Sequence, residues 1–346
     1  MRKVIILLCV LCLFSTTVSA MEFVAPSAPS DAQELMPDEQ STFSADLWYI
    51  IKNAIAKLQP NFSAAIKTCV SLIGIVLIIS VASSFNGAGK QTVELVGTIS
   101  VSILLMQSSN LLIRLGVSTI QQISEYAKLL LPVMTSAMAA EGAITTSAAL
   151  YTGTVLFNTL LSSAITRLII PMVYIYIVLS IVHSAIGEEL IERIRDFIKW
   201  LMTWSLKIAV YLFTGYIGIT GVISGTADAV SVKAAKLALS GLVPVIGNII
   251  SDASETILIS AGVMKNAVGV YGLLAIIALC IGPFLQIGMQ YLLLKISGAV
   301  CSTIGTNKQV KIIDDFTSVM GFLLGMTGTV CLIHLISTVC IMKGVT

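Results

Sequence analysis

The stretch from residue 240 to residue 275 carries the polar groups with the greatest capacity for chemistry in an otherwise apolar chain. Asp252 and Glu255 stand three residues apart and Asn248 precedes Asp252 by four, so all three share one face if the segment is helical. Paired carboxylates can perform acid–base or cation chemistry, line a polar path, or cap and solvate a helix end. We expect the structural role, because no nucleophile–base pair, metal-ligand cluster or phosphate-binding loop accompanies them.

The same stretch also mixes helix-breaking residues with residues that allow close packing. A proline removes one helical hydrogen bond, and glycines let neighbouring backbones approach closely. Hydrocarbon does not solvate polar side chains, so those at membrane depth normally face protein or a water-filled cavity. The candidate pore, packing or assembly residues are therefore Gly241, Pro244, Gly247, Asp252, Glu255, Lys265, Asn266, Gly269 and Gly272.

The composition places these residues in a membrane protein. The chain is 56% hydrophobic and 11% charged, whereas a soluble domain carries about 25% charged residues. The sequence therefore predicts an all-α, polytopic transmembrane helical bundle. The net charge of +2 does not suggest a nucleic-acid partner. No cofactor or metal is expected, and nothing in the sequence indicates an enzyme.

The N-terminal region divides into three parts before the membrane domain begins at residue 60. Residues 1–20 have the basic start, short apolar centre and small-residue end of a signal peptide. Residues 21–42 are acidic, rich in proline and free of Lys and Arg, which predicts a disordered extracytoplasmic tail. Residues 43–59 have apolar residues at helical spacing, typical of an interfacial amphipathic helix.

Residues 60–346 contain seven clear apolar stretches and one ambiguous stretch. Residues 117–140 begin with polar residues and contain Pro132, so they either cross as a polar-faced helix or re-enter. We expect seven or eight crossings, within a range of six to nine. The clear spans are predicted at about residues 66–85, 93–113, 146–165, 168–186, 208–223, 268–294 and 316–341, with a polar connector at 295–311.

The segment from Glu188 to Lys199 is the most charged part of the chain. Its apolar residues form one stripe, and Glu192 with Arg195 and Asp196 with Lys199 stand three residues apart. This pattern predicts a surface-lying connector helix, with partner docking as an alternative role. If this segment is cytoplasmic and the tail is outside, residues 240–266 must form a re-entrant or broken element for the later lysines to be cytoplasmic.

The cysteines and histidines are expected to be structural. Cys69, Cys280, Cys301, Cys331 and Cys340 occur singly in or beside apolar runs, which is typical of buried free thiols. The two histidines also lie in apolar stretches. His183 and His334 are predicted to be hydrogen-bonded interior side chains rather than ligands or proton relays.

Three sequence runs carry a resemblance to a known family. The run Leu242-Val-Pro-Val-Ile-Gly is followed by Ser251-Asp-Ala-Ser-Glu-Thr and then by Lys265-Asn-Ala-Val-Gly-Val-Tyr-Gly-Leu. Together they resemble stage III sporulation protein AE, a multi-pass membrane protein of endospore-forming bacteria. The layout of leader, polar tail and many apolar spans is similar along nearly the whole chain. Asn248 departs from the family pattern, which has a small residue there.

This resemblance implies a subunit of the mother-cell channel that reaches the forespore. The implied partners are other membrane subunits and a separate ATPase of the complex, with a forespore membrane protein as an indirect partner. It implies location in the mother-cell membrane around the forespore and no catalytic residues. From the residues alone, a secondary transporter or permease for a small solute is the alternative. An intramembrane hydrolase would need a nucleophile or metal motif.

Overall fold

Long α-helices make up nearly all of the described chain. The computed structural model describes residues 25–37, 42–85, 89–140, 144–219 and 267–343. A short helix, α2, precedes the bundle, and a π-helical turn, η1, joins α5 to α6. The elements are α2 (Ser30–Gln33), α3 (Phe43–Phe85), α4 (Lys90–Ala140), α5 (Ile144–Ala164), η1 (Ile165–Ile169), α6 (Ile170–Ile186), α7 (Glu189–Ile219), α10 (Ala267–Ile304) and α11 (Asn307–Lys343).

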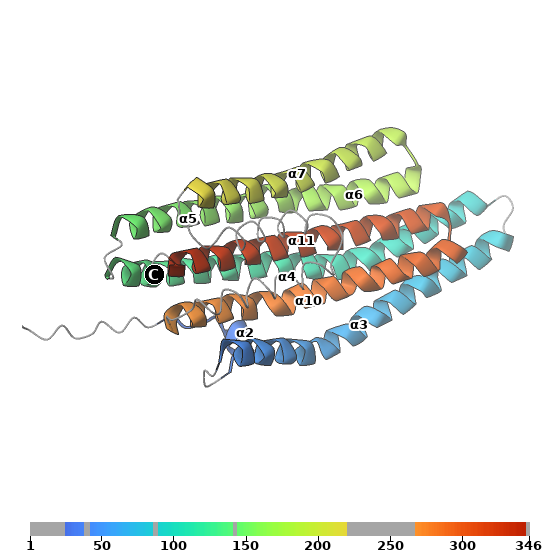
Figure 1. The fold of residues 1–346 in the computed structure, drawn as a ribbon. Coiled ribbons are helices and arrows are strands. Elements are labelled where there is room, and N and C mark those ends of the chain that lie inside the picture. The colour runs from blue at the N-terminus through green and yellow to red at the C-terminus, as the bar shows by residue number, and fades with distance from the viewer. Residues whose placement is uncertain (1–24, 38–41, 86–88, 141–143, 220–266, 344–346) are drawn as a thin grey trace, which may run out of the picture.

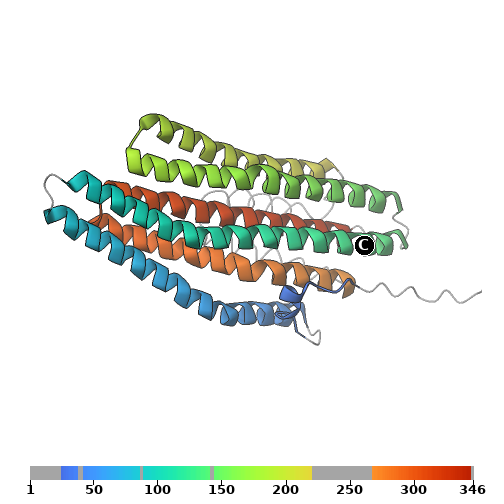
Figure 2. The ribbon, with the colours of Figure 1, turned by 180° about the vertical axis from the view of Figure 1, so that it is seen from behind.

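The helices lie side by side along one long axis, and α11 is central among them. Figures 1 and 2 show the order from α7 through α6, α11 and α10 to α3, with α4 beside α11. Helix α11 contacts α10, α4, α6, α7 and α5. Most of its large apolar side chains are accordingly buried, among them Phe316, Met320, Leu323 and Ile333. Helix α11 is thus the central helix around which the other helices pack.

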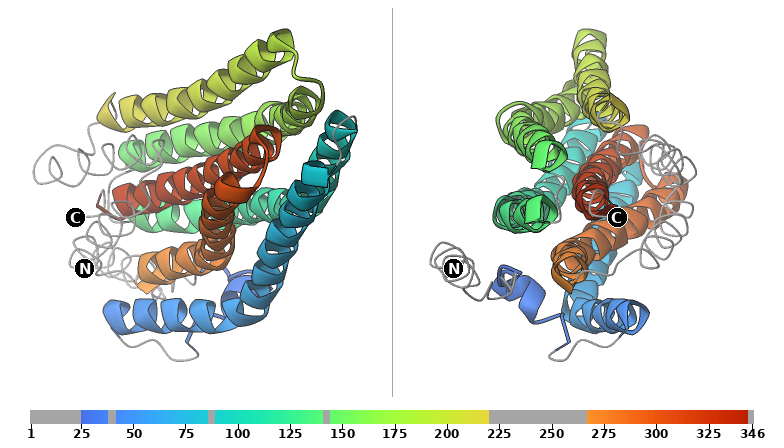
Figure 3. Two further views of the ribbon diagram at one scale, coloured as in Figure 1. Left: turned by 90° about the vertical axis from the view of Figure 1, so that its right-hand side faces the viewer. Right: turned by 60° about the vertical axis from the view of Figure 1, so that its left-hand side comes forward.

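Several predicted spans join into single helices. The amphipathic segment and the first span form α3, which runs through Pro60 and changes direction along its length (Figure 3). Residues 93–113 and 117–140 form the one helix α4, and the spans on either side of Arg167 are joined through η1. The predicted breaks at Arg114 and Arg167 are wrong, because a single charged residue that stays exposed does not interrupt a helix.

Five helical stretches within the described residues are long and apolar enough to cross a membrane. They are Phe43–Phe85, Lys90–Ala137, Tyr151–Ile186, Val268–Ile304 and Asn307–Met342. The 51-residue helix α4 would be about 77 Å long, against about 30 Å for a hydrocarbon core. The structure confirms an all-helical bundle with several membrane-length helices, but not seven or eight spans. The proposed re-entrant segment lies outside the described residues.

Part of the acidic N-terminal segment packs on the bundle, where its composition predicts disorder. Ala28, Ala32 and Leu35 are buried with side chains of α3, α4 and α10. Gln122 on α4 donates a hydrogen bond of 3.0 Å to Asp31, and Lys57 on α3 pairs with Glu34. These apolar and polar contacts together dock residues 25–37 on the bundle. The predicted boundary between residues 59 and 60 likewise falls within α3.

Candidate functional site

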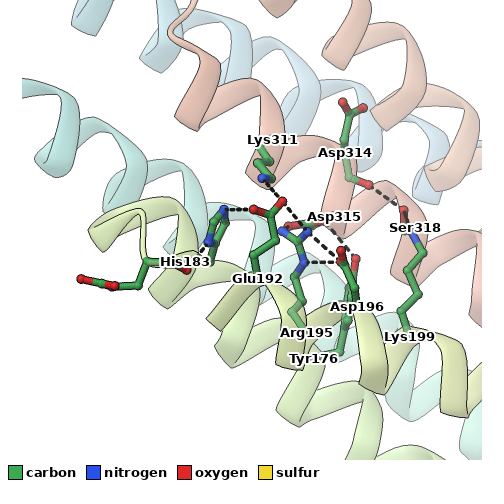
Figure 4. A network of polar contacts seen from close by, with 11 residues as sticks. Tyr176, His183, Glu192, Arg195, Asp196, Lys199, Lys311, Asp314, Asp315 and Ser318 are labelled. Atoms are coloured by element: carbon green, nitrogen blue, oxygen red, sulfur yellow. Dashed lines mark hydrogen bonds and ion pairs between the residues drawn. The ribbon is translucent and has the colours of Figure 1, made fainter. Parts of the chain in front are cut away.

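Charged side chains of α7 and α11 meet polar side chains of α6 near the point where α6 turns into α7. Figure 4 shows the network, in which α7 supplies Glu192, Arg195 and Asp196, and α11 supplies Lys311 and Asp315. Tyr176 and His183 reach it from α6. The elements α6 and α7 run antiparallel, and α7 and α11 run parallel, so residues distant in sequence come together here.

Arg195 is the centre of this network. Its residue exposure is only 5%, so its charge must be compensated by nearby carboxylates. Nη1 donates to Oδ2 of Asp315 at 3.1 Å. Nε and Nη2 donate to Oδ1 of Asp196 at 3.0 and 2.8 Å, and Nη2 lies 3.3 Å from Oε1 of Glu192. Tyr176 completes the arrangement by donating to Oδ1 of Asp315 at 2.9 Å.

A second set of contacts ties the start of α7 to α11 and α6. Lys311 donates to Oε1 of Glu192 at 2.5 Å. Nε2 of His183 lies 3.8 Å from Oε2 of the same carboxylate. Nδ1 of His183 is 3.1 Å from the Glu188 carbonyl oxygen, so this nitrogen carries the proton. His183 is thus a hydrogen-bonded interior residue, as its sequence context predicts.

The tight α6–α7 turn places these helices at contact distance. Gly187 ends α6 with φ of +86°, and its N–H donates to the His183 carbonyl at 2.7 Å. Glycine adopts this left-handed conformation without the steric cost that a side chain brings. Nearby, Lys308 of α11 donates to the Ala185 carbonyl at 3.3 Å. The turn is therefore held from both its own backbone and α11.

The electrostatics of the network favour the charged forms of Arg195 and Glu192. Burial opposes the charge of Arg195, but the hydrogen bond to Asp196 and the charge of Asp315 raise its pKa above the ordinary value. The hydrogen bond from Lys311 lowers the pKa of Glu192. The arrangement thus stabilises fixed ion pairs that anchor α7 to α11.

The opposite side of α7 is apolar and exposed. Phe197, Trp200 and Trp204 stack in sequence, with ring centroids 5.8 and 5.9 Å apart. This face continues along the helix at turn spacing. Its exposed large side chains are Leu190, Ile194, Phe197, Trp200, Trp204, Ile208, Tyr211 and Leu212. Helix α7 therefore buries the charge of Arg195 against α11 and also exposes a run of large apolar side chains, which is unusual for a helix on a soluble protein.

The structure joins the predicted connector helix to the apolar stretch that follows it. Residues 189–219 form one helix whose charged face packs on α11. The predicted Glu192–Arg195 pair is confirmed at 3.3 Å. Asp196 instead pairs with Arg195, and Lys199 donates to Ser318 at 3.1 Å. Sequence reasoning missed Asp315, because its partner is 120 residues away.

The candidate residues from the polar central stretch are mostly outside the described part of the chain. Gly241, Pro244, Gly247, Asp252, Glu255, Lys265 and Asn266 fall there. The other two lie in α10 at close helix contacts. A Cβ at Gly269 would come within 2.4 Å of Met342, and one at Gly272 within 2.5 Å of Leu130. These two glycines are thus packing positions between α10 and its neighbours.

The cysteines agree with the structural role predicted for them. Cys69, Cys280, Cys301, Cys331 and Cys340 are free and buried. Within the described residues, no group of three His, Cys, Asp or Glu side chains is placed to hold a metal ion. The ion-pair network between α6, α7 and α11 is the most strongly organised polar feature that the described residues contain.

Comparison with known proteins gives two matches. The family model described as Stage III sporulation protein AE matches residues 30–345. The Stage III sporulation protein AE of Bacillus subtilis (strain 168) is 22% identical over 244 residues. That alignment covers 70% of this chain and 61% of the relative, so the chain spans about three fifths of it. No solved structure matches.

Proposed function

The chain belongs to the stage III sporulation protein AE family, and from this premise we propose that it is a non-enzymatic, multi-pass membrane subunit of the channel complex that joins mother cell and forespore. In this proposal it resides in the mother-cell membrane around the forespore, with its N-terminal tail extracytoplasmic. The observation that carries the proposal is the family match over residues 30–345 on a bundle with five membrane-length helices.

The two faces of α7 suit a subunit of a larger membrane assembly. The Arg195–Asp315 ion pair holds the inner face on α11, which leaves the outer aromatic face free for lipid or a neighbouring subunit. Aromatic side chains are enriched both at membrane interfaces and at protein interfaces. The network is thus proposed to have a positioning role: it keeps the outward face of α7 at a fixed angle to the bundle.

The proposed partners follow from the family role. They are other membrane subunits of the same sporulation complex, a separate ATPase, and indirectly a protein of the forespore membrane. The sequence contains no phosphate-binding loop of the GxxxxGK[ST] type, which is consistent with energy supplied by another subunit. No nucleic-acid partner is proposed.

Deletion and complementation in the endospore-forming host test this proposal. We expect deletion to stop development after engulfment and the wild-type gene to restore it. Arg195→Ala should fail to restore it at equal membrane levels, whereas Lys199→Ala, which loses one exposed hydrogen bond on the same helix, should restore it. Intact sporulation in the deletion strain would reject the proposal and favour a transporter.

A companion pair of variants addresses the polar central stretch. If Asp252→Asn/Glu255→Gln restores development at normal protein levels, the two carboxylates are structural or dispensable. If the double variant fails to restore development at normal protein levels, the two carboxylates are needed for the function of the subunit.

A further inference from the structure

Ser124, Asn158 and His334 are among the buried side chains that have a polar atom without a hydrogen-bond partner among the described residues. Ser124 on α4, Asn158 on α5 and His334 on α11 have exposures of 4, 3 and 1%. The unpartnered atoms are Oγ of the serine, both Oδ1 and Nδ2 of the amide, and Nε2 of the imidazole. Buried polar groups are almost always paired with protein or ordered water. These three unpartnered side chains come from three different helices, and one common cause would explain them.

Contacts along α7 place the amide and the imidazole at one level of the bundle. Helices α7 and α11 run parallel, as the Arg195–Asp315 and Lys199–Ser318 hydrogen bonds show together. Counting the same number of residues onward from Lys199 on α7 and from Ser318 on α11 brings Phe213 within one turn of His334. The Phe213 ring contacts Phe157 of α5, with centroids 5.1 Å apart. Asn158 directly follows Phe157, so it lies within about one turn of His334 along the axis.

An independent contact places the serine at the same level. On α4, the position of a Cβ at Gly116 is 3.6 Å from Thr327 Oγ1 of α11. The two helices are parallel, so the same pairing puts Ser124 opposite a residue adjacent to His334. Ser124, Asn158 and His334 therefore occupy one level where α4, α5 and α11 adjoin, and each is turned away from solvent.

The His334 imidazole provides a hydrogen-bond acceptor at this level of the bundle. Nδ1 of His334 lies 2.8 Å from the Val330 carbonyl oxygen. A carbonyl only accepts, so Nδ1 carries a proton, and burial of the ring disfavours its charged form, which leaves Nε2 with a lone pair. The Ser124 hydroxyl and the Asn158 amide can each donate and accept. An uncharged set of this kind matches a molecule that both donates and accepts.

We propose that Ser124, Asn158 and His334 form a buried water site inside the bundle. Water donates to Nε2 of His334 and satisfies the hydroxyl and the amide, which together provide the two to four partners that a buried water needs. The three side chains are neutral, so the site selects water over an ion. The unpartnered Ser109 hydroxyl lies further along α4, in the direction of the α6–α7 turn.

Magnetisation transfer from water to the histidine rings in the full-length, detergent-solubilised protein tests the site. The chain has two histidines, and His183→Gln assigns their signals. We expect a water cross-peak at the His334 ring in the wild type and its loss in Asn158→Leu. Ser337→Ala is the matched control, because its buried hydroxyl is already bonded to the Ile333 carbonyl, and the cross-peak should persist there.

The apparent melting temperature of the same variants gives a second readout. Leucine is close in size to asparagine. If it displaces bound water, it strands Nε2 of His334 and the Ser124 hydroxyl, and the melting temperature falls. If the site is dry, leucine removes an unpaired amide and the melting temperature rises. A missing wild-type cross-peak, or a rise in melting temperature for Asn158→Leu, overturns the proposal.

Discussion

The buried charged groups at the α6–α7 end and the buried neutral groups further along the bundle are held in different ways. At the α6–α7 end, Arg195 has carboxylates on two helices within hydrogen-bond distance. Further along the bundle, Asn158 and His334 retain atoms without a described partner. A buried charge is stable only with an opposite charge nearby, whereas a buried neutral group can be satisfied by water. Buried charge therefore fixes helix positions at the α6–α7 end, whereas a buried neutral group does not need a partner on a particular helix.

The largest expected effect comes from unpairing the buried charges. Arg195→Ala leaves Asp315 buried beside Tyr176 alone, so we expect a loss of about 3–5 kcal/mol in the free energy of unfolding. Lys199→Ala, on the same helix, loses one exposed hydrogen bond and should change stability by no more than about 0.5 kcal/mol. Unfolding titrations in detergent measure both. Similar losses in the two variants would show that the network is not anchoring α7.

The turn between the helices should respond next most strongly. Gly187→Ala places a side chain at φ of +86°, and we expect a loss of roughly 1–2 kcal/mol. Gly215→Ala is a matched control within α7, since no atom lies within 4 Å of its added Cβ. It should stabilise the helix by about 0.5–1 kcal/mol. The same titrations measure both, and a shared sign would refute the assigned role of the turn.

Acidification should weaken the α6–α7 end. The lowered pKa of Glu192 means that the unfolded state binds more protons between the folded-state and unfolded-state pKa values. The contribution of Glu192 is therefore present above the unfolded value of about 4.3 and is lost as pH falls through the folded value. Melting temperature against pH should show a shallower acid decline in Glu192→Gln than in the wild type. A Glu189→Gln profile provides the comparison, and coincidence of all three would contradict the assignment.

The outward face of α7 should contribute least to stability. Trp200 is 52% exposed, so Trp200→Ala is expected to change the free energy of unfolding by no more than about 0.5 kcal/mol. Its effect should appear instead in co-purification with other membrane subunits, or in stability after transfer from detergent to lipid. If Trp200→Ala destabilises the detergent-solubilised protein as Arg195→Ala does, the two faces of α7 are not distinct.

Much of the helical architecture follows from apolar periodicity, but the helix boundaries do not. Arg114 and Arg167 suggest ends of spans in the sequence, yet both stay exposed on continuous helices. The helical register pairs Glu192 with Arg195 because both lie on one helix. It contains no information on Asp315, since that contact depends on how α7 packs against α11. His334 is predicted to be a hydrogen-bonded interior residue, which the structure confirms, but its grouping with Ser124 and Asn158 escapes prediction because three separate helices bring them to one level.

The ion pair between α7 and α11 is the central claim, and a double-mutant cycle tests it most directly. The variants are Arg195→Ala, Asp315→Ala and their combination, with free energies of unfolding measured in one detergent. The account predicts that the double variant is little worse than the worse single variant, which gives a coupling energy of about 1–3 kcal/mol. Additivity of the two single effects to within about 0.5 kcal/mol would contradict it.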